Sequence, residues 1–539
     1  MKRLENVRVP MRDGICLSAD IYMPDHSGSF PALFSMSPYG KEVQGFPAAL
    51  FPHVEAGDMD YFVNKGYVWV IADSRGRYPS EGQWNLFDKE EQQDGYELVE
   101  WIARQPWCDG KVAGMGMSYF AIIQYLVAAL QPPSLKTIVP IGGCFDFYRD
   151  FAYYGGLYHS GFLARWLTVT LARCLPPDGA APLEKWLPPR DVILDTLMHP
   201  HDGPYYDERS LANRHHRVKV PVYQIIAPST LSHRRLLMAF ESIDAPKKLL
   251  IGTGSGWALL YNESLKIQIG RWLDYWMKDI QTGIMEEPPV ILYVPGKNQW
   301  RYEQNYPIDR TAWTTYYLCA GGDRGANEAP FGLLSRDMPG EEKPDNYSWP
   351  ESQKQVETDL PVLAFSTAPL EEEIELVGPA SLTLYASSSA DDTAWVVRID
   401  DQAPDGSLAV VGFGWLKASC RKLDETRSAP GRPYHTYKNP TRIEPGRIYR
   451  YEIEIWPMIN CFKAGHRLRV RIASSDSAKL DGMVSIFLSP ETPAVNTIYH
   501  DRQHPSCLLL PVIPPDTTAG KPQLDFEYKP IAHAVKSWV

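Results

Sequence analysis

Runs of apolar residues separated by polar turns dominate the first part of the chain. Residues 4–23 alternate apolar and polar positions around Arg12-Asp13-Gly14, which predicts a β-hairpin with a glycine in its turn. Continuously apolar runs, typical of strands buried on both faces, follow at residues 31–36, 66–72 and 112–115. Because residues 94–104 between the last two have helical spacing, we predict a mainly parallel α/β sheet.

The strand pattern is interrupted once. After a strand-like run at 137–141, residues 145–217 are aromatic and helical in spacing and contain two Pro-Pro pairs. The sheet pattern then returns at 222–226 and 248–251, and residues 263–278 have helical periodicity. We therefore predict a helical cap inserted into the α/β core.

From about Trp313 the pattern changes to short runs of alternating apolar and polar residues, separated by Gly, Pro, Asp and Asn. This pattern predicts a β-sandwich. The clearest of these runs are residues 380–385, 395–399, 449–456 and 468–472. Residues 340–350 are rich in charge and proline, and we interpret them as an exposed loop.

Composition narrows the classes of partner. The 539 residues carry a net charge of −11, which gives no basic field for nucleic acid, so we expect a small-molecule partner. No apolar run approaches the roughly 20 residues that span a bilayer, and residues 1–7 lack a secretory signal, so we expect no membrane partner and a cytoplasmic protein. The eight cysteines form no C-x-x-C pair, and we expect neither a metal nor a cofactor.

One serine stands at the tip of a predicted strand-to-helix turn. A serine there has a strained backbone, and residues two before it and two or three after it must be small. Gly116 and Ala121 meet this need around Ser118, whereas Phe120 stands where G-x-S-x-G has its second glycine. Ser118 is a candidate nucleophile, and a glycine-rich turn with a bystander serine is the alternative.

Further motifs share an order along the chain with this turn. They are Val9-Pro10-Met11-Arg12-Asp13-Gly14, Ser37-Pro38-Tyr39-Gly40-Lys41, Asp73-Ser74-Arg75-Gly76-Arg77 with Ser80-Glu81-Gly82, Gly116-Met117-Ser118-Tyr119, Tyr205-Tyr206-Asp207-Glu208-Arg209-Ser210, Asp274-Tyr275-Trp276 and Tyr499-His500-Asp501. With them the chain resembles, over nearly its whole length, the cocaine esterase and nonactin hydrolase family, which is related to X-Pro dipeptidyl peptidases.

The resemblance implies an α/β-hydrolase core with an inserted helical cap and a C-terminal jelly-roll β-sandwich. We place the core at residues 1–144 and 219–310, the cap at 145–218 and the sandwich at 311–539. The ligand pocket is then expected where core, cap and sandwich meet, because ligand sites favour domain junctions.

The resemblance also implies site residues. In the family a serine attacks an acyl carbonyl, and a tyrosine hydroxyl with the backbone N–H after the serine binds the oxyanion; Tyr39 and Tyr119 stand at the matching positions. Trp166 lies in a segment that resembles the pocket-lining helix, and simple packing within the cap is its alternative role. Without the resemblance, Tyr39 would be interpreted as a packed loop residue.

The acid and the histidine of a catalytic triad are not where the resemblance implies them. The expected aspartate falls on Thr230 and the expected histidine falls near Gly256. A serine hydroxyl is a poor nucleophile until a base removes its proton, so Ser118 lacks the usual activation. His233 and His159 are candidate substitute bases, and a structural or exposed role is the alternative for each.

Three functions follow from these residues. The first is an enzyme that polarises an acyl or carbonyl group of its substrate for a non-hydrolytic step, namely cyclisation, condensation or rearrangement. The second is an esterase, lactonase or amidase in which a displaced histidine activates Ser118. The third is a catalytically silent ligand-binding protein on the same scaffold. The sequence leaves the substrate and the oligomeric state open.

Overall fold

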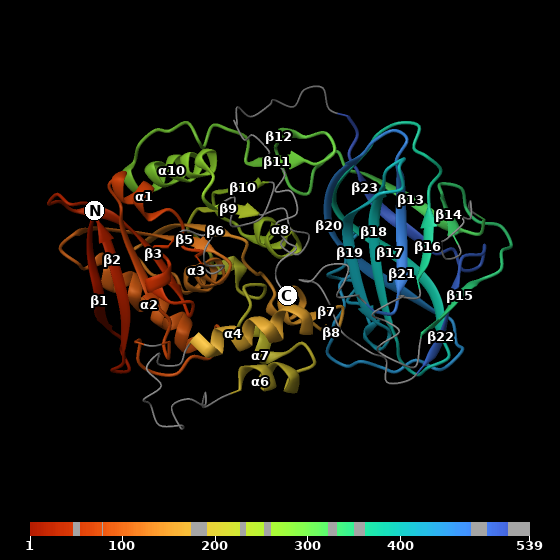
Figure 1. The fold of residues 1–539 in the computed structure, drawn as a ribbon, viewed down its shortest axis with the longest axis horizontal. Helices are drawn as coiled ribbons and strands as arrows, with labels where there is room; N and C mark the ends of the chain where they lie inside the picture. The colour runs from red at the N-terminus through yellow and green to blue at the C-terminus, as the bar shows by residue number, and fades with distance from the viewer. Residues whose placement is uncertain are drawn as a thin grey trace.

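The computed structural model places an α/β core and a β-rich C-terminal part side by side, with the cap below the core (Figure 1). It describes residues 1–46, 54–77, 79–173, 191–226, 233–252, 260–321, 331–349, 362–475 and 493–515. None of the helices in these ranges is long and apolar enough to cross a membrane.

The core is a ten-stranded sheet. Its strands, in spatial order, are β1 (Lys2–Pro10), β2 (Cys16–Met23), β4 (Val68–Asp73), β3 (Phe30–Ser37), β5 (Cys108–Met117), β6 (Leu135–Ile141), β9 (Val222–Ile226), β10 (Lys247–Ile251), β11 (Val290–Val294) and β12 (Gln299–Glu303). All neighbours from β4 to β11 pair in parallel, and the pairs at the two ends are antiparallel. This arrangement confirms the predicted mainly parallel sheet.

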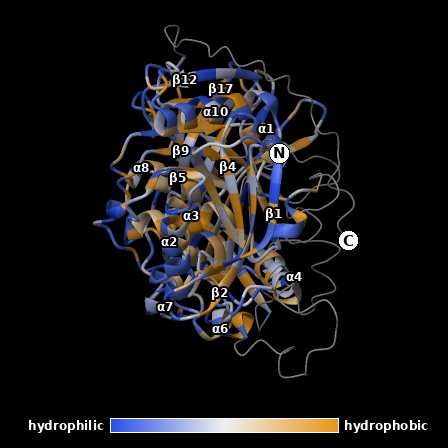
Figure 2. Cartoon of the chain, turned by 90° about the vertical axis from the view of Figure 1, so that its left-hand side faces the viewer, coloured by the Kyte–Doolittle hydropathy of each residue, from blue (hydrophilic) through white to orange (hydrophobic). Residues whose placement is uncertain are grey.

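Burial explains why the strand runs differ in sequence. Strand β4 is buried at every position and lies inside the molecule, whereas β1 at the edge is mostly exposed and hydrophilic (Figure 2). The predicted hairpin is the β1–β2 pair, and Gly14 in its turn has a φ of 89°. A side chain there would be strained because L-residues rarely adopt positive φ.

Helices pack on the core sheet, and capping residues fix where three of them begin. The described core helices are α1 (Met59–Asn64), α2 (Lys89–Ala103), α3 (Tyr119–Leu130), α8 (His233–Ser242) and α10 (Glu263–Lys278). Asp58, Asp88 and Asn262 each accept a hydrogen bond from a backbone N–H in the first turn of α1, α2 and α10. The range predicted for α10 from periodicity matches its observed bounds.

The cap is less regular than predicted. Its described helical elements are η2 (Tyr148–Ala152), η3 (Ser160–Ala164), α4 (Arg165–Arg173), α6 (Val192–Met198), α7 (Pro204–Asp207) and η4 (His215–Arg217). A small hairpin of β7 (Tyr153–Tyr154) and β8 (Leu157–Tyr158) interrupts them and reaches toward the sandwich (Figure 1). Gly155 and Gly156, both with positive φ, form its turn.

The C-terminal part is an eleven-stranded sheet that closes on itself, because β17 pairs with β20, β22 and also β23. Its strands, in spatial order, are β15 (Asp345–Trp349), β22 (Ala494–Tyr499), β17 (Ile374–Ser388), β20 (Tyr449–Phe462), β19 (Leu408–Lys417), β18 (Ala394–Gln402), β21 (Arg467–Ala473), β16 (Leu363–Ser366), β14 (Phe331–Ser335), β13 (Ala312–Cys319) and β23 (Cys507–Val512). The predicted fold class, an α/β-hydrolase core with an inserted cap and a C-terminal β-rich part, is confirmed.

The expected exposed loop at 340–350 is wrong in its second half. Residues 345–349 form β15, which pairs antiparallel with β22 and buries Tyr347 while its neighbours Asn346 and Ser348 stay exposed. The residues form a strand despite their polar composition because pairing with β22 outweighs their low intrinsic strand propensity. The expected boundaries at 144, 218 and 310 stay a prediction; the elements change character between β6 and β9 and again after β12.

Candidate active site

Ser118 occupies a strained turn between β5 and α3. Its φ of 59° and ψ of −114° lie outside the regions that non-glycine residues favour. The conformation is held from both sides, because Ser118 N–H donates to the Ile141 carbonyl at 2.8 Å and its carbonyl accepts the N–H groups of Ala121 and Ile122. Strain maintained by the surrounding backbone is characteristic of functional sites.

The turn explains the missing second glycine of G-x-S-x-G. Gly116 has a φ of 133°, and a Cβ built on it would lie 2.6 Å from the Cβ of Phe120. Phe120 therefore occupies the space that the absent side chain of Gly116 leaves, and it is fully buried. The turn therefore accommodates Phe120 in place of the second glycine of G-x-S-x-G, but it requires glycine at position 116.

Tyr39 lies in the loop that follows β3 and reaches over the start of α3. Its ring makes edge contacts with Tyr119 at 5.7 Å and with Phe120 at 6.3 Å. The loop is anchored to the end of β4, because Lys41 N–H donates to the Asp73 carboxylate at 2.8 Å. Burial raises the pKa of Asp73 to about 8, so this anchor is an acid that favours its neutral form.

The hydroxyl of Tyr119 takes part in a buried polar network. It lies 2.7 and 2.8 Å from the two carboxylate oxygens of Glu91 and accepts the indole N–H of Trp84 at 3.0 Å. Burial raises the pKa of the fully enclosed Glu91 to about 7. Tyr119 is the first residue of α3, so its backbone N–H has no acceptor within the helix.

Glu91 was not predicted as a site residue, although the sequence around it carries a local signal. Asp88 caps α2 by accepting Glu91 N–H at 2.9 Å, and Glu91 reaches back to the N–H of Phe87 at 2.8 Å. This pattern is close to a capping box, in which the Glu accepts the N–H of the cap residue itself rather than that of the residue before it. Its sequence signature is an acid followed three residues later by Glu. The contact between Glu91 and Tyr119 has no such local signal.

Trp166, the one cap residue predicted at the pocket, lies against both tyrosines. Its indole N–H donates to the Tyr39 hydroxyl at 2.9 Å, and its ring centroid is 6.1 Å from that of Tyr119. Tyr39, Tyr119 and Trp166 are therefore brought together, and Ser118, which directly precedes Tyr119 in the chain, is partly exposed. That Trp166 faces Ser118 stays a prediction.

The two candidate substitute bases have different places. His159 is fully buried in the cap, where its Nδ1 lies 3.3 Å from the Phe151 carbonyl and its ring lies 4.2 Å from that of Tyr154. His233 is the first residue of α8. No hydrogen bond joins the Ser118 hydroxyl to any histidine whose side chain the structure describes. Thr230 and Gly256, the positions expected for the acid and the histidine, lie outside the described ranges.

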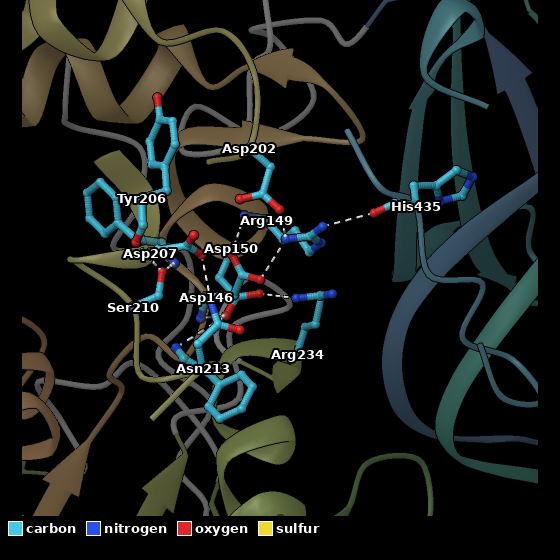
Figure 3. Close-up of polar contacts among 12 residues, drawn as sticks. Asp146, Arg149, Asp150, Asp202, Tyr206, Asp207, Ser210, Asn213, Arg234 and His435 are labelled. Atoms are coloured by element: carbon cyan, nitrogen blue, oxygen red, sulfur yellow. Dashed lines mark hydrogen bonds and ion pairs between the residues drawn. The ribbon is translucent and has the colours of Figure 1, made fainter. Parts of the chain in front are cut away.

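Buried charges hold the cap in place (Figure 3). Arg149 forms ion pairs with Asp146 at 2.9 Å and with Asp202 at 2.8 Å, all within the cap. It also donates to the carbonyl of His435, which belongs to the C-terminal part, at 2.9 Å. The cap is therefore tied to the sandwich by a residue that is itself nearly inaccessible.

A second arginine connects three parts of the molecule. Arg234 at the start of α8 pairs with Asp150 of the cap and, at 2.8 Å, with Glu454 of β20. Because a buried charge is costly without a partner, this triad favours one arrangement of core, cap and sandwich. In the described ranges, no group of three or more His, Cys, Asp or Glu side chains is placed to hold a metal ion.

Comparisons with known proteins agree with this architecture. Residues 13–255 match the model of the X-Pro dipeptidyl-peptidase (S15 family), and residues 282–509 match that of the X-Pro dipeptidyl-peptidase C-terminal non-catalytic domain. The cocaine esterase of Rhodococcus sp. (strain MB1 Bresler) is 28% identical over 94% of this chain and 98% of its own length.

Solved structures give the same picture. A CocE/NonD family hydrolase from Staphylococcus aureus superposes with a TM-score of 0.83 at 25% identity, covering 95% of this chain and 93% of its own. An alpha-amino acid ester hydrolase superposes with a TM-score of 0.75 at 20% identity, covering 95% of this chain and 96% of its own. The second likeness concerns the fold.

Proposed function

We propose a function for this chain from the family to which it belongs, the cocaine esterase and nonactin hydrolase (CocE/NonD) family. The protein is then an enzyme that polarises an acyl or carbonyl group of a small-molecule substrate. The family is one of serine-hydrolase-like esterases and peptidases. Our proposal for this member is a non-hydrolytic step, namely cyclisation, condensation or rearrangement. Such steps proceed from a polarised carbonyl and a folded substrate without a strong protein nucleophile.

One contrast carries the proposal. The strained Ser118 turn, the Tyr39 hydroxyl and the first N–H of α3 are retained, whereas Thr230 and Gly256 stand where an acid and a histidine are expected. Tyr39 and the Tyr119 N–H would stabilise negative charge on the substrate oxygen. Without a base, Ser118 keeps its proton at neutral pH and generic ester hydrolysis is weak.

A hydrolase with a displaced base is the second candidate. The similarity to a cocaine esterase over nearly the whole chain favours it, because a conserved architecture suits the same reaction class. In that case His233 or His159 would take the proton of Ser118, and the enzyme would be an esterase, lactonase or amidase. A silent ligand-binding protein is the remaining alternative.

A fluorophosphonate probe separates these functions when it is combined with turnover of p-nitrophenyl acetate. Residual hydrolysis above the solvent rate without labelling of Ser118 supports the proposal, because water can attack a polarised ester without a protein base. Rapid labelling that Ser118→Ala removes would replace it with the displaced-base hydrolase. Neither labelling nor turnover would make the protein a binding protein.

A further inference from the structure

The hydrogen bond between Trp166 and Tyr39 connects the cap to the predicted oxyanion site. Trp166 lies in α4 of the cap and Tyr39 in the loop after β3, yet their polar atoms are 2.9 Å apart and both side chains are buried. A contact between residues 127 positions apart in the chain forms only when the cap is docked on the core.

The chemistry of the two groups fixes the direction of this bond. An indole N–H can only donate, so the Tyr39 hydroxyl must be the acceptor. The single phenolic proton of Tyr39 takes no part in this bond, so the hydroxyl can still act as a donor to a different acceptor. A hydroxyl that accepts a hydrogen bond also becomes a stronger donor, because neighbouring bonds polarise one another.

Trp166 is itself held by aromatic residues of the cap. The Phe162 ring stacks parallel to it at 6.2 Å, and the Phe151 ring meets it edge-on at 5.3 Å. The Trp166 carbonyl accepts the Thr170 hydroxyl at 2.8 Å within the helix. The indole therefore presents its N–H from a fixed position.

We propose that Trp166 is a positioning residue which orients the Tyr39 hydroxyl and strengthens it as the donor to the substrate carbonyl. The inference rests on the proposed function, in which Tyr39 polarises that carbonyl. It adds that the cap controls catalysis through a single N–H group, apart from any contact that Trp166 makes with substrate.

A double-mutant cycle with Tyr39→Phe tests the inference, with p-nitrophenyl acetate as the probe. Trp166→Phe keeps an aromatic ring and removes the N–H, so kcat should fall about fivefold, the value of one ordinary hydrogen bond, with KM nearly unchanged. In the Tyr39→Phe background the same change should alter kcat less than twofold, because the hydroxyl it acts on is absent.

Trp84→Phe is the matched control. It removes another buried indole N–H, the one that Trp84 donates to the Tyr119 hydroxyl, so its effect should add to that of Tyr39→Phe. If Trp166→Phe is additive with Tyr39→Phe as well, the inference is wrong and the proposed function stands. If Tyr39→Phe alone leaves kcat unchanged, both are wrong.

A second replacement removes the N–H without changing the shape of the side chain. β-(3-Benzothienyl)alanine at position 166 has sulfur in place of N–H and keeps the packing against Phe151 and Phe162. The same fivefold loss of kcat is expected if Trp166→Phe is too unstable to assay. An unchanged kcat for this variant would overturn the inference.

Discussion

The half of the site that would hold a carbonyl group and the half that would activate a nucleophile are built from different kinds of residue. The first consists of buried, mutually hydrogen-bonded groups: Tyr39 with Trp166, and Tyr119 with Glu91. For the second half we propose Thr230 and Gly256 at the positions expected for an acid and a histidine, and these residue types offer neither a base nor an acid. On this proposal, carbonyl polarisation and nucleophile activation are separable functions of the scaffold.

The largest expected effect comes from removing the hydroxyl of Tyr39. Tyr39→Phe should lower residual hydrolysis of p-nitrophenyl acetate by about 10²- to 10³-fold, the range found for single oxyanion donors. Ser118→Ala should lower it less than about threefold, because a serine without a base contributes little. Steady-state kinetics of both variants decide the comparison; complete loss in Ser118→Ala would reverse it.

The free energy of unfolding should depend on pH through Glu91, the buried acid that is hydrogen-bonded to the Tyr119 hydroxyl. The folded pKa of Glu91, about 7, exceeds its ordinary 4.5, so folding favours the neutral acid. Its contribution is complete below pH 4.5 and is lost as pH rises through 7, on the order of 3 kcal/mol. Asp73, with a pKa of about 8, acts in the same direction.

Glu91→Gln removes this titration and should make the decline of unfolding free energy between pH 5 and 8 shallower, leaving the part that Asp73 contributes. Urea denaturation at several pH values measures it. Glu90→Gln, a more exposed neighbour in the same helix, is the control and should leave the decline unchanged. An equal decline in Glu91→Gln would show that Glu91 does not titrate in this window.

Introducing an acid and a histidine at positions 230 and 256 should change ester hydrolysis less than Tyr39→Phe does. The double variant Thr230→Asp with Gly256→His should raise both ester hydrolysis and fluorophosphonate labelling about tenfold, less than a well-placed general base supplies. Gly256→His alone should gain less, because the imidazole then lacks a partner that fixes its tautomer. Wild-type protein that already labels as fast as the double variant would contradict the contrast between the halves.

The smallest effects are expected from the candidate substitute bases. His159→Asn can keep a hydrogen bond to the Phe151 carbonyl, and His233→Asn changes only the first residue of α8. Each should change p-nitrophenyl acetate turnover less than about twofold, since a residue that takes no proton contributes no general-base catalysis. A loss above tenfold together with loss of labelling would identify that histidine as the base of Ser118.

Much of the fold was predictable because buried strands and helices show continuous or periodic apolar residues in the local sequence. Strands β4 and β9 are buried at every position and, apart from Asp73 and Gln224, are apolar in sequence, and the periodic segment of α10 ends where the helix ends. Strand β15 was not predictable, since Tyr347 is the one buried residue among 345–348, the positions whose burial is described, and its pairing with β22 is a long-range contact. The β7–β8 hairpin had a signal in Gly155-Gly156, which the aromatic surroundings obscured.

The candidate site was predictable to a lesser degree. The Ser118 turn is a local pattern, and Tyr39 came from the family resemblance. The partners that fix these groups lie far away in sequence, as with Tyr119 and Glu91, 28 positions apart, and Tyr39 and Trp166, 127 apart. Residue types alone do not determine which buried hydroxyl meets which donor.

The turn of the β7–β8 hairpin limits how pieces of this family can be exchanged. A Cβ on Gly155 would lie 2.0 Å from the carbonyl oxygen of Trp415 in β19, and the Gly155 carbonyl accepts the N–H of Lys417 at 2.8 Å. The hairpin belongs to the N-terminal match in sequence but to β19 in packing. A chimera carrying a relative's C-terminal part must therefore also carry that relative's hairpin.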